Sequence, residues 1–209
     1  MRAKKVIVIH VKDDIEKEEL MKELQKLELP AFIYVHGKLN SLKINIQGTK
    51  DEIREAMQKV REIHYKVRSR LYPNKKGFYQ YDVDDIFREA GVTISIPILI
   101  KTLELLGEYS ELKEDKLISS LPWEEIVELV KKLGGILSDI SLQTTRQIRE
   151  VVIPLAATFD IDPQDVLEFA VDFGVAEYKE DKFKYELVKN KEQAMEIMLK
   201  KLRGEENEN

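Results

Sequence analysis

The chain has 209 residues, of which 43% are hydrophobic, 35% are charged and none is cysteine. Disulfides, iron–sulfur clusters and thiolate zinc sites are therefore excluded, and His10, His36 and His64 lie too far apart in sequence to suggest a metal site. Neither a signal peptide nor a run of about 18 apolar residues is present, so we expect a cytoplasmic protein without a membrane span. The abundance of Glu, Lys, Ile and Val is similar to that of thermophilic proteins.

Positive charge is concentrated in one segment of an otherwise acidic chain. The net charge is −5, but residues 59–76 carry seven lysines and arginines against one glutamate, a local charge of +6 that leaves −11 for the remainder. A basic segment on an acidic protein attracts a polyanion at one place only.

The first part of the chain predicts three strands and two helices in the order β-α-β-β-α. Strands are indicated by β-branched or alternating residues, and the helices by apolar residues at helical spacing behind capping residues. The expected elements are strands at 5–11, 31–36 and 42–47, a helix that opens at Asp13 and Asp14, and a long helix that opens at Thr49. Two helices are enough to cover one face of a three-stranded sheet.

The other face of this predicted sheet carries polar and aromatic side chains. By strict alternation its residues are Phe32, Tyr34 and His36 on the second strand and Lys43, Asn45 and Gln47 on the third. Aromatic and amide groups on an open sheet can hold single-stranded bases. A neighbouring domain that covers the face is the alternative, and the sequence leaves both interpretations open.

Residues 43–56, KINIQGTKDEIREA, resemble the closing strand and helix of a KH domain. The β-α-β-β-α order is also similar to the small tRNA-contacting subunit of the archaeal KEOPS complex. No Gly-x-x-Gly occurs in the first seventy residues, so the phosphate clamp of ordinary KH domains is missing and any RNA contact must come from elsewhere. As a whole, the chain resembles an uncharacterised archaeal family of about this length, which implies fold and lineage without an assigned activity.

The second half of the chain contains one pattern twice. Residues 86–107 align with residues 153–174 at a constant offset of 67, and each copy continues into a charged tight turn, at 113–116 and at 179–182. The identical pairs are Ile86/Ile153, Ala90/Ala157, Ile94/Ile161 and Gly107/Gly174. Each copy predicts helix, turn, helix and hairpin, the outline of a winged helix-turn-helix.

Two helices are expected to join these copies. One begins at Pro122 and should stop near Gly134 and Gly135, and the next, at 136–152, should end before Pro154. Asp162 and Asn190 are expected to cap the last two helices.

We therefore predict an α+β fold with a KH-like N-terminal domain and two winged-helix-like units. The predicted domains are the KH-like domain at 1–72, the first unit at 78–135, the second unit at 136–203 and a disordered tail at 204–209.

The long helix that opens at Thr49 carries the candidate RNA-binding surface. Arginine, tyrosine and lysine side chains form two stripes along the flanks of its apolar face, and Lys75 and Lys76 extend the basic run beyond it. Guanidinium groups bind phosphate with two hydrogen bonds, and arginine and tyrosine planes stack on unpaired bases. The candidate nucleic-acid-binding residues are Arg54, Lys59, Arg61, Tyr65, Lys66, Arg68, Arg70, Lys75 and Lys76. Alternatively, these cations only cover apolar surface with their methylene groups.

The winged units suggest DNA binding, but their charges oppose it. The second helix of the first unit, 94–106, offers Lys101 beside Glu104, and that of the second unit, 163–173, has no cation. Because DNA affinity depends on neutralising phosphates, such helices are better suited to docking a protein or a second copy of the chain. The candidate partner-binding residues are Ile98, Leu105, Gln143 and Arg146, with core packing or a solvated connector as the alternative.

No catalytic, nucleotide-binding or metal-binding motif is present, so we expect no enzyme, no cofactor, no metal and no small-molecule substrate. The expected function is a non-catalytic, RNA-associated factor whose partner is a structured RNA, in a ribosomal subunit or as tRNA, and which docks a protein or forms a homodimer. The alternatives are a DNA-binding transcriptional regulator and a protein–protein adaptor or homo-oligomer that binds no nucleic acid.

Overall fold

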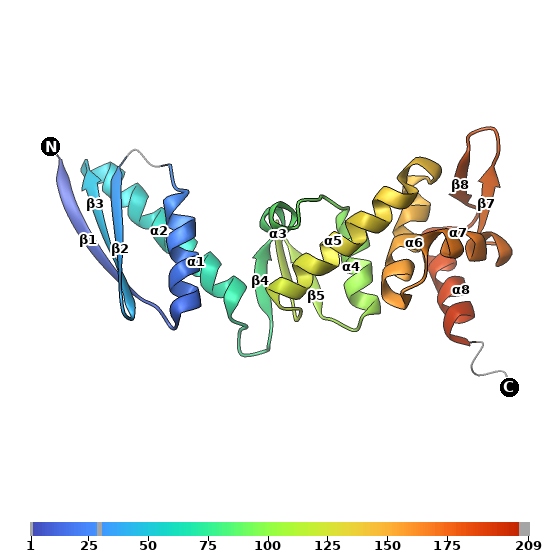
Figure 1. Cartoon of the computed structure of the whole chain (residues 1–209), viewed down its shortest axis with the longest axis horizontal. Helices are drawn as coiled ribbons and strands as arrows, with labels where there is room; N and C mark the ends of the chain where they lie inside the picture. The colour runs from blue at the N-terminus through green and yellow to red at the C-terminus, as the bar shows by residue number, and fades with distance from the viewer. Residues whose placement is uncertain (1, 29–30, 205–209) are drawn as a thin grey trace. The chain divides into compact units, whose positions relative to one another are not determined.

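The computed structural model of the protein describes residues 2–28 and 31–204, without the side chains of Phe32, Tyr34 and Lys38. The chain divides into two compact units, unit 1 at Met1–Tyr81 and unit 2 at Asp82–Asn209 (Figure 1). The predicted α+β class is confirmed. The predicted division of the second half into two domains stays a prediction, and the predicted tail lies outside the described residues from 205 onward.

Unit 1 has the predicted order β-α-β-β-α. Its elements are β1 (Ala3–His10), α1 (Asp14–Gln25), β2 (Phe32–Lys38), β3 (Ser41–Gly48) and α2 (Lys50–Leu71). Asp13 and Thr49 cap the two helices, and their side chains accept hydrogen bonds from the backbone N–H groups of Glu16 and Glu52. The capping signals in the sequence therefore set where both helices begin.

The three strands form an antiparallel sheet in the order β1-β3-β2, with both helices on one face (Figure 1). The central strand β3 contributes fully buried Leu42, Ile44 and Ile46 to the core between sheet and helices. On the opposite face, Val6 and Val8 of β1 are 49% and 53% exposed. Among the described residues of unit 1, no helix lies over that face, so no part of unit 1 covers it.

A fully buried carboxylate joins α1 to α2. Glu16 accepts a hydrogen bond of 2.7 Å from the backbone N–H of Lys12, and its other oxygen lies 3.1 Å from Nε2 of His64 and 3.5 Å from Nε of Arg68. Because a buried carboxylate needs several donors to offset its lost hydration, these contacts fix the position of α2 beside α1.

The same seam continues at the last turn of α2. Arg70 is 6% exposed, and its guanidinium lies 3.0 Å from Glu19 and 3.8 Å from Glu23. Glu16, Glu19 and Glu23 lie on one face of α1 because they are three and four residues apart. The C-terminal half of α2 therefore pairs with an acidic stripe inside unit 1.

Unit 2 shows the predicted repeat of helix, helix and hairpin. It contains α3 (Val83–Ala90), α4 (Ile96–Leu105), β5 (Ser110–Lys113), β6 (Lys116–Ser119), α5 (Trp123–Ile140), a short 3-10 helix η1 (Ser141–Gln143), α6 (Arg146–Phe159), α7 (Pro163–Asp172), β7 (Ala176–Lys179), β8 (Lys184–Leu187) and α8 (Lys191–Gly204). The strand β4 (Tyr79–Asp82) spans the boundary between the units, and within unit 2 β5 pairs with β6 and β7 pairs with β8.

The repeat extends to the backbone and the core. Gly107 and Gly174, at the same position in the two copies, end α4 and α7 with φ angles of 78° and 74°, a left-handed conformation that favours glycine. Ile86 and Ile153 are both fully buried. The hairpins differ in turn length, since the second turn is longer, but each turn includes a non-glycine residue with positive φ, Glu114 at 54° and Phe183 at 55°.

Two predicted helix ends are wrong. α5 continues through Gly134 and Gly135, and Pro154 lies inside α6 rather than beyond its end. The predicted start of the second helix at 136 is wrong as well, since residues 136–140 belong to α5 and α6 begins at Arg146. A Cβ atom at residue 134 would lie 2.6 Å from a methyl of Val92, so this glycine allows close packing and does not end the helix. α6 contacts α4, α5, α7 and α8 and is buried from Val151 to Ala157, and this packing offsets the hydrogen bond that proline cannot donate.

None of the helices in the described ranges has an apolar stretch long enough to cross a membrane.

The first prediction concerns Gly134. We expect Gly134→Ala to lower the free energy of unfolding by about 1–3 kcal/mol, because the added methyl overlaps Val92. Gly135→Ala is the matched control: with nothing within 4 Å, it should raise stability by about 0.5–1 kcal/mol through helix propensity. Urea unfolding measures both, and Val92→Ala should recover part of the loss. Equal effects at the two glycines would contradict the packing argument.

The second prediction separates two arginines of α2. We expect Arg70→Ala to destabilise the protein by about 1–3 kcal/mol, because it leaves partly buried carboxylates without their partner. Arg61→Ala, at an exposed position of the same helix, should change stability by less than about 0.5 kcal/mol. Thermal or urea unfolding distinguishes the two, and a large loss in Arg61→Ala would show that this arginine is structural as well.

Candidate nucleic-acid interface

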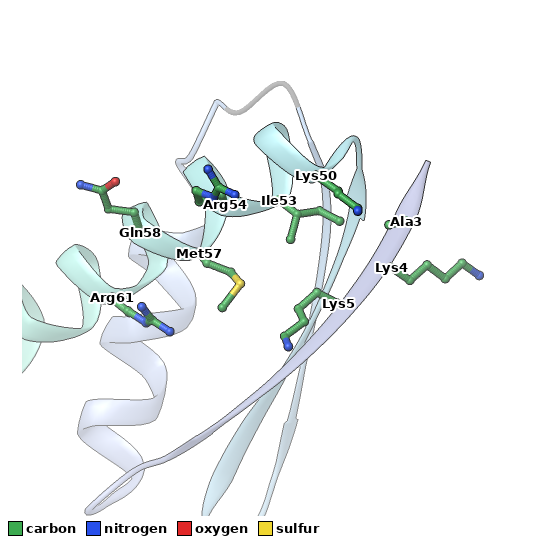
Figure 2. A pocket seen from close by; sticks show the side chains of 9 residues that line it. All are labelled: Ala3, Lys4, Lys5, Lys50, Ile53, Arg54, Met57, Gln58 and Arg61. Atoms are coloured by element: carbon green, nitrogen blue, oxygen red, sulfur yellow. The ribbon is translucent and has the colours of Figure 1, made fainter. Parts of the chain in front are cut away.

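A cationic groove lies between the edge strand β1 and the first half of α2 (Figure 2). Its volume is about 570 Å³, and its lining residues are Ala3, Lys4, Lys5, Lys50, Ile53, Arg54, Met57, Gln58 and Arg61. Figure 2 shows Met57 pointing into this space, with Lys5 from β1 and Arg61 from α2 on opposite sides of it. The groove thus combines an apolar floor with a cationic rim.

Helix and strand periodicity place these side chains. Arg54, Gln58 and Arg61 are four and three residues apart, so they project from one flank of α2. Lys5 stands opposite Ile46 in the sheet, on the face that the helices cover. Lys5 therefore lines the space between β1 and α2 at the edge of the sheet.

The cations of the groove are not neutralised by carboxylates. Within the described part of the chain, Lys5, Lys50, Arg54 and Arg61 form no ion pair and no side-chain hydrogen bond. This contrasts with Arg70, which forms ion pairs with Glu19 and Glu23. Unpaired guanidinium and ammonium groups around one groove favour an anion with several oxygen acceptors, such as phosphate.

The structure gives the predicted arginines of α2 two different environments. Arg54 and Arg61 line the groove, whereas Arg68 lies beside Glu16 and Arg70 is buried in the α1–α2 seam. Tyr72, which caps the C-terminus of α2, lies under the ammonium of Lys12, which is 4.4 Å from its ring centroid. Arg54 and Arg61 therefore line the groove, whereas Arg68, although 54% exposed, and Arg70 pair with carboxylates of α1.

The remaining predicted residues lie outside the groove, on α2 and in the loop that follows it. Lys59 and Tyr65 are exposed on α2, while Lys66 is partly buried and is engaged in an interaction with the protein. Lys75 and Lys76 are exposed in the loop after α2, where Asn74 accepts hydrogen bonds from the backbone N–H groups of Lys76 and Phe78. The ordered loop keeps both lysines at the surface.

Sequence reasoning missed Lys5 and Lys50. Lys5 interrupts the series of residues 3, 5, 7 and 9, whose other members are apolar, so a single cation at a core-facing position of an edge strand was the available signal. Lys50 follows the cap of α2 and carries no comparable signal.

Most of the predicted partner-binding residues are not exposed to a partner. Ile98 is 3% exposed and belongs to the core of unit 2, and Leu105 is partly buried. Gln143 donates a hydrogen bond of 2.7 Å to Gln164, and Arg146 is exposed with Glu150 at 4.0 Å. Of the four, Arg146 alone presents an exposed side chain.

The helices of unit 2 that would contact DNA carry little positive charge. Lys101 of α4 pairs with Glu104 at 3.2 Å, and α7 contains Asp165, Glu168 and Asp172 without a cation. Across residues 2–28 and 31–204, no group of three or more His, Asp or Glu side chains is arranged to hold a metal ion.

Comparison with known proteins gives a family but no activity. A chain of the solved structure entitled "Crystal structure of a/eIF2alpha-aDim2p-rRNA complex from Pyrococcus horikoshii OT3" shares 14% identity, with 81% of this chain and 96% of that chain covered. Its TM-score of 0.16 is too low for an argument about fold or function. No curated protein matches the chain. Residues 9–196 match the model of an uncharacterised protein family conserved in archaea (DUF2067), and the chain therefore belongs to this archaeal family.

Proposed function

We propose that the protein is a non-catalytic, RNA-associated factor that binds phosphates of RNA in the groove between β1 and α2. The observation that carries the proposal is the set of four cations, Lys5, Lys50, Arg54 and Arg61, which line one groove without carboxylate partners in the described chain. Exposed Lys59, Tyr65, Lys75 and Lys76 extend the surface that RNA would meet.

The distribution of charge between the units supports the same proposal. Unit 1 contains 18 lysines and arginines and 11 aspartates and glutamates, a net charge of +7, which leaves −12 for unit 2. A polyanion is attracted to the first unit and repelled by the second. RNA binding is therefore confined to unit 1.

Unit 2 is proposed to dock a protein or a second copy of the chain. Its acidic α7 and exposed apolar side chains such as Leu142 and Phe183 suit a protein surface better than nucleic acid. A ribosomal subunit, or tRNA with a bound protein, offers both an RNA and a protein surface to such a factor. The DNA-binding alternative is disfavoured because Lys101 is paired and α7 is acidic.

The third prediction tests the groove. We expect Arg54→Glu/Arg61→Glu to lower RNA affinity roughly tenfold or more and to reduce the slope of log K against log salt by about 1.4–1.8, because two phosphate contacts are lost. Fluorescence anisotropy with labelled RNA at several salt concentrations measures both quantities. The variant should unfold at the same urea concentration as the native protein.

The control is Lys200→Glu, which makes the same kind of charge reversal at an exposed position of α8. It should leave RNA affinity and the salt slope almost unchanged. If Lys200→Glu and the groove variant reduce binding equally, only net charge matters and the groove is not the site. Loss of duplex DNA binding in Lys101→Glu, with groove variants unaffected, would favour the DNA-binding regulator instead.

A further inference from the structure

The open face of the sheet in unit 1 has an unusual composition for a solvent-exposed surface. β1, β2 and β3 contain no aspartate or glutamate, although the protein has 39 of these residues. Val6 and Val8, which project from the face at the edge strand, are about half exposed. An exposed apolar strip beside polar groups, without negative charge, is suited to an anionic ligand that also has apolar surfaces.

The register places hydrogen-bonding groups beside this strip. Val6 stands opposite Asn45, Val8 opposite Lys43 and Lys4 opposite Gln47, so the side chains of each pair lie on the same face. The amides of Asn45 and Gln47 both donate and accept hydrogen bonds, as the edges of nucleobases do. The face therefore offers apolar contact for the planes of nucleobases and hydrogen-bonding groups for their edges.

This face meets the cationic groove at β1. Lys4 and Lys5 are neighbours in the strand, and Figure 2 shows Lys5 turned toward the groove and Lys4 turned away from it. Successive side chains of a strand point to opposite faces, so one side of β1 is lined by groove cations and the other by Val6 and Val8. A strand of nucleotides along this edge would have phosphates on one side and bases on the other.

We infer that the RNA bound by this protein is single-stranded, with its phosphates in the groove and its unpaired bases over Val6, Val8, Asn45 and Gln47. The inference rests on the proposed function, which supplies the phosphate contacts. Bases held in a duplex cannot turn over the edge of β1, so the sheet face contributes only to binding of unpaired nucleotides. Apolar contact with the base faces is largely independent of sequence, while the two amides add a preference among bases.

The experiment compares a labelled single-stranded RNA of about twelve nucleotides with the duplex of the same sequence, using anisotropy at several salt concentrations. We expect the native protein to bind the single strand more tightly. Val6→Ser/Val8→Ser should lower the single-strand affinity by a factor of about five to a hundred, because base contacts are lost. Its salt slope should not change, since no charge is altered, and its weak duplex binding should be unaffected.

Two controls accompany this variant. Val188→Ser makes the same change at a valine of unit 2 that is 50% exposed, and it should bind as the native protein does. Urea unfolding of Val6→Ser/Val8→Ser checks that the sheet is intact, and Asn45→Ala/Gln47→Ala provides a second variant that removes base-edge contacts without touching β1.

The outcomes distinguish this inference from the proposed function. Equal affinity for single strand and duplex, or no effect of both sheet-face variants while Arg54→Glu/Arg61→Glu still reduces binding, overturns the inference alone. Absence of salt-dependent RNA binding by the native protein overturns both. If the sheet-face variants instead lower the molar mass in sedimentation equilibrium and leave RNA affinity unchanged, the face is a contact between copies of the chain, and the inference is again wrong.

Discussion

The buried carboxylate of Glu16 is the contact on which the arrangement of unit 1 depends. It takes a backbone N–H of the turn before α1 together with His64 and Arg68 of α2, so it sets the rotation of α2 about its own axis. That rotation determines which cations of α2 remain exposed. Arg70 is directed to α1, whereas Arg54 and Arg61, on the opposite flank, are directed to the edge of the sheet.

A helix rich in arginine can thus serve two purposes along its length. In the C-terminal half of α2, positive charge stabilises the packing of two helices by meeting the acids of α1. In the N-terminal half, Arg54 and Arg61 form no ion pair within the described part of the chain, and they remain available to a ligand. Removing an arginine of either kind reduces the positive charge of unit 1. The two kinds differ in stability measurements, because only the loss of an arginine paired with α1 lowers the free energy of unfolding.

Local signals predicted much of the fold. Asp13 and Thr49 cap their helices through side-chain hydrogen bonds to the next turn, and such contacts depend on residues three positions apart. The left-handed glycines Gly107 and Gly174 likewise end helices for a local reason. The local pattern at Gly134 and Pro154 gives the wrong helix ends. Gly134 packs against Val92, which is distant in sequence, and Pro154 is held in its helix by the packing of neighbouring helices around α6.

The sequence by itself determined the order of the elements, the repeat in the second half and the concentration of positive charge in the first, because periodicity, capping and composition are properties of neighbouring residues. Only the tertiary structure decided which of those charges are free. Glu16 and Arg68 are separated by more than fifty residues, as are Lys5 and Arg61, and whether a cation meets a carboxylate or an open groove depends on which helix faces it. Side-chain pairing across elements follows from packing, and no local pattern encodes it.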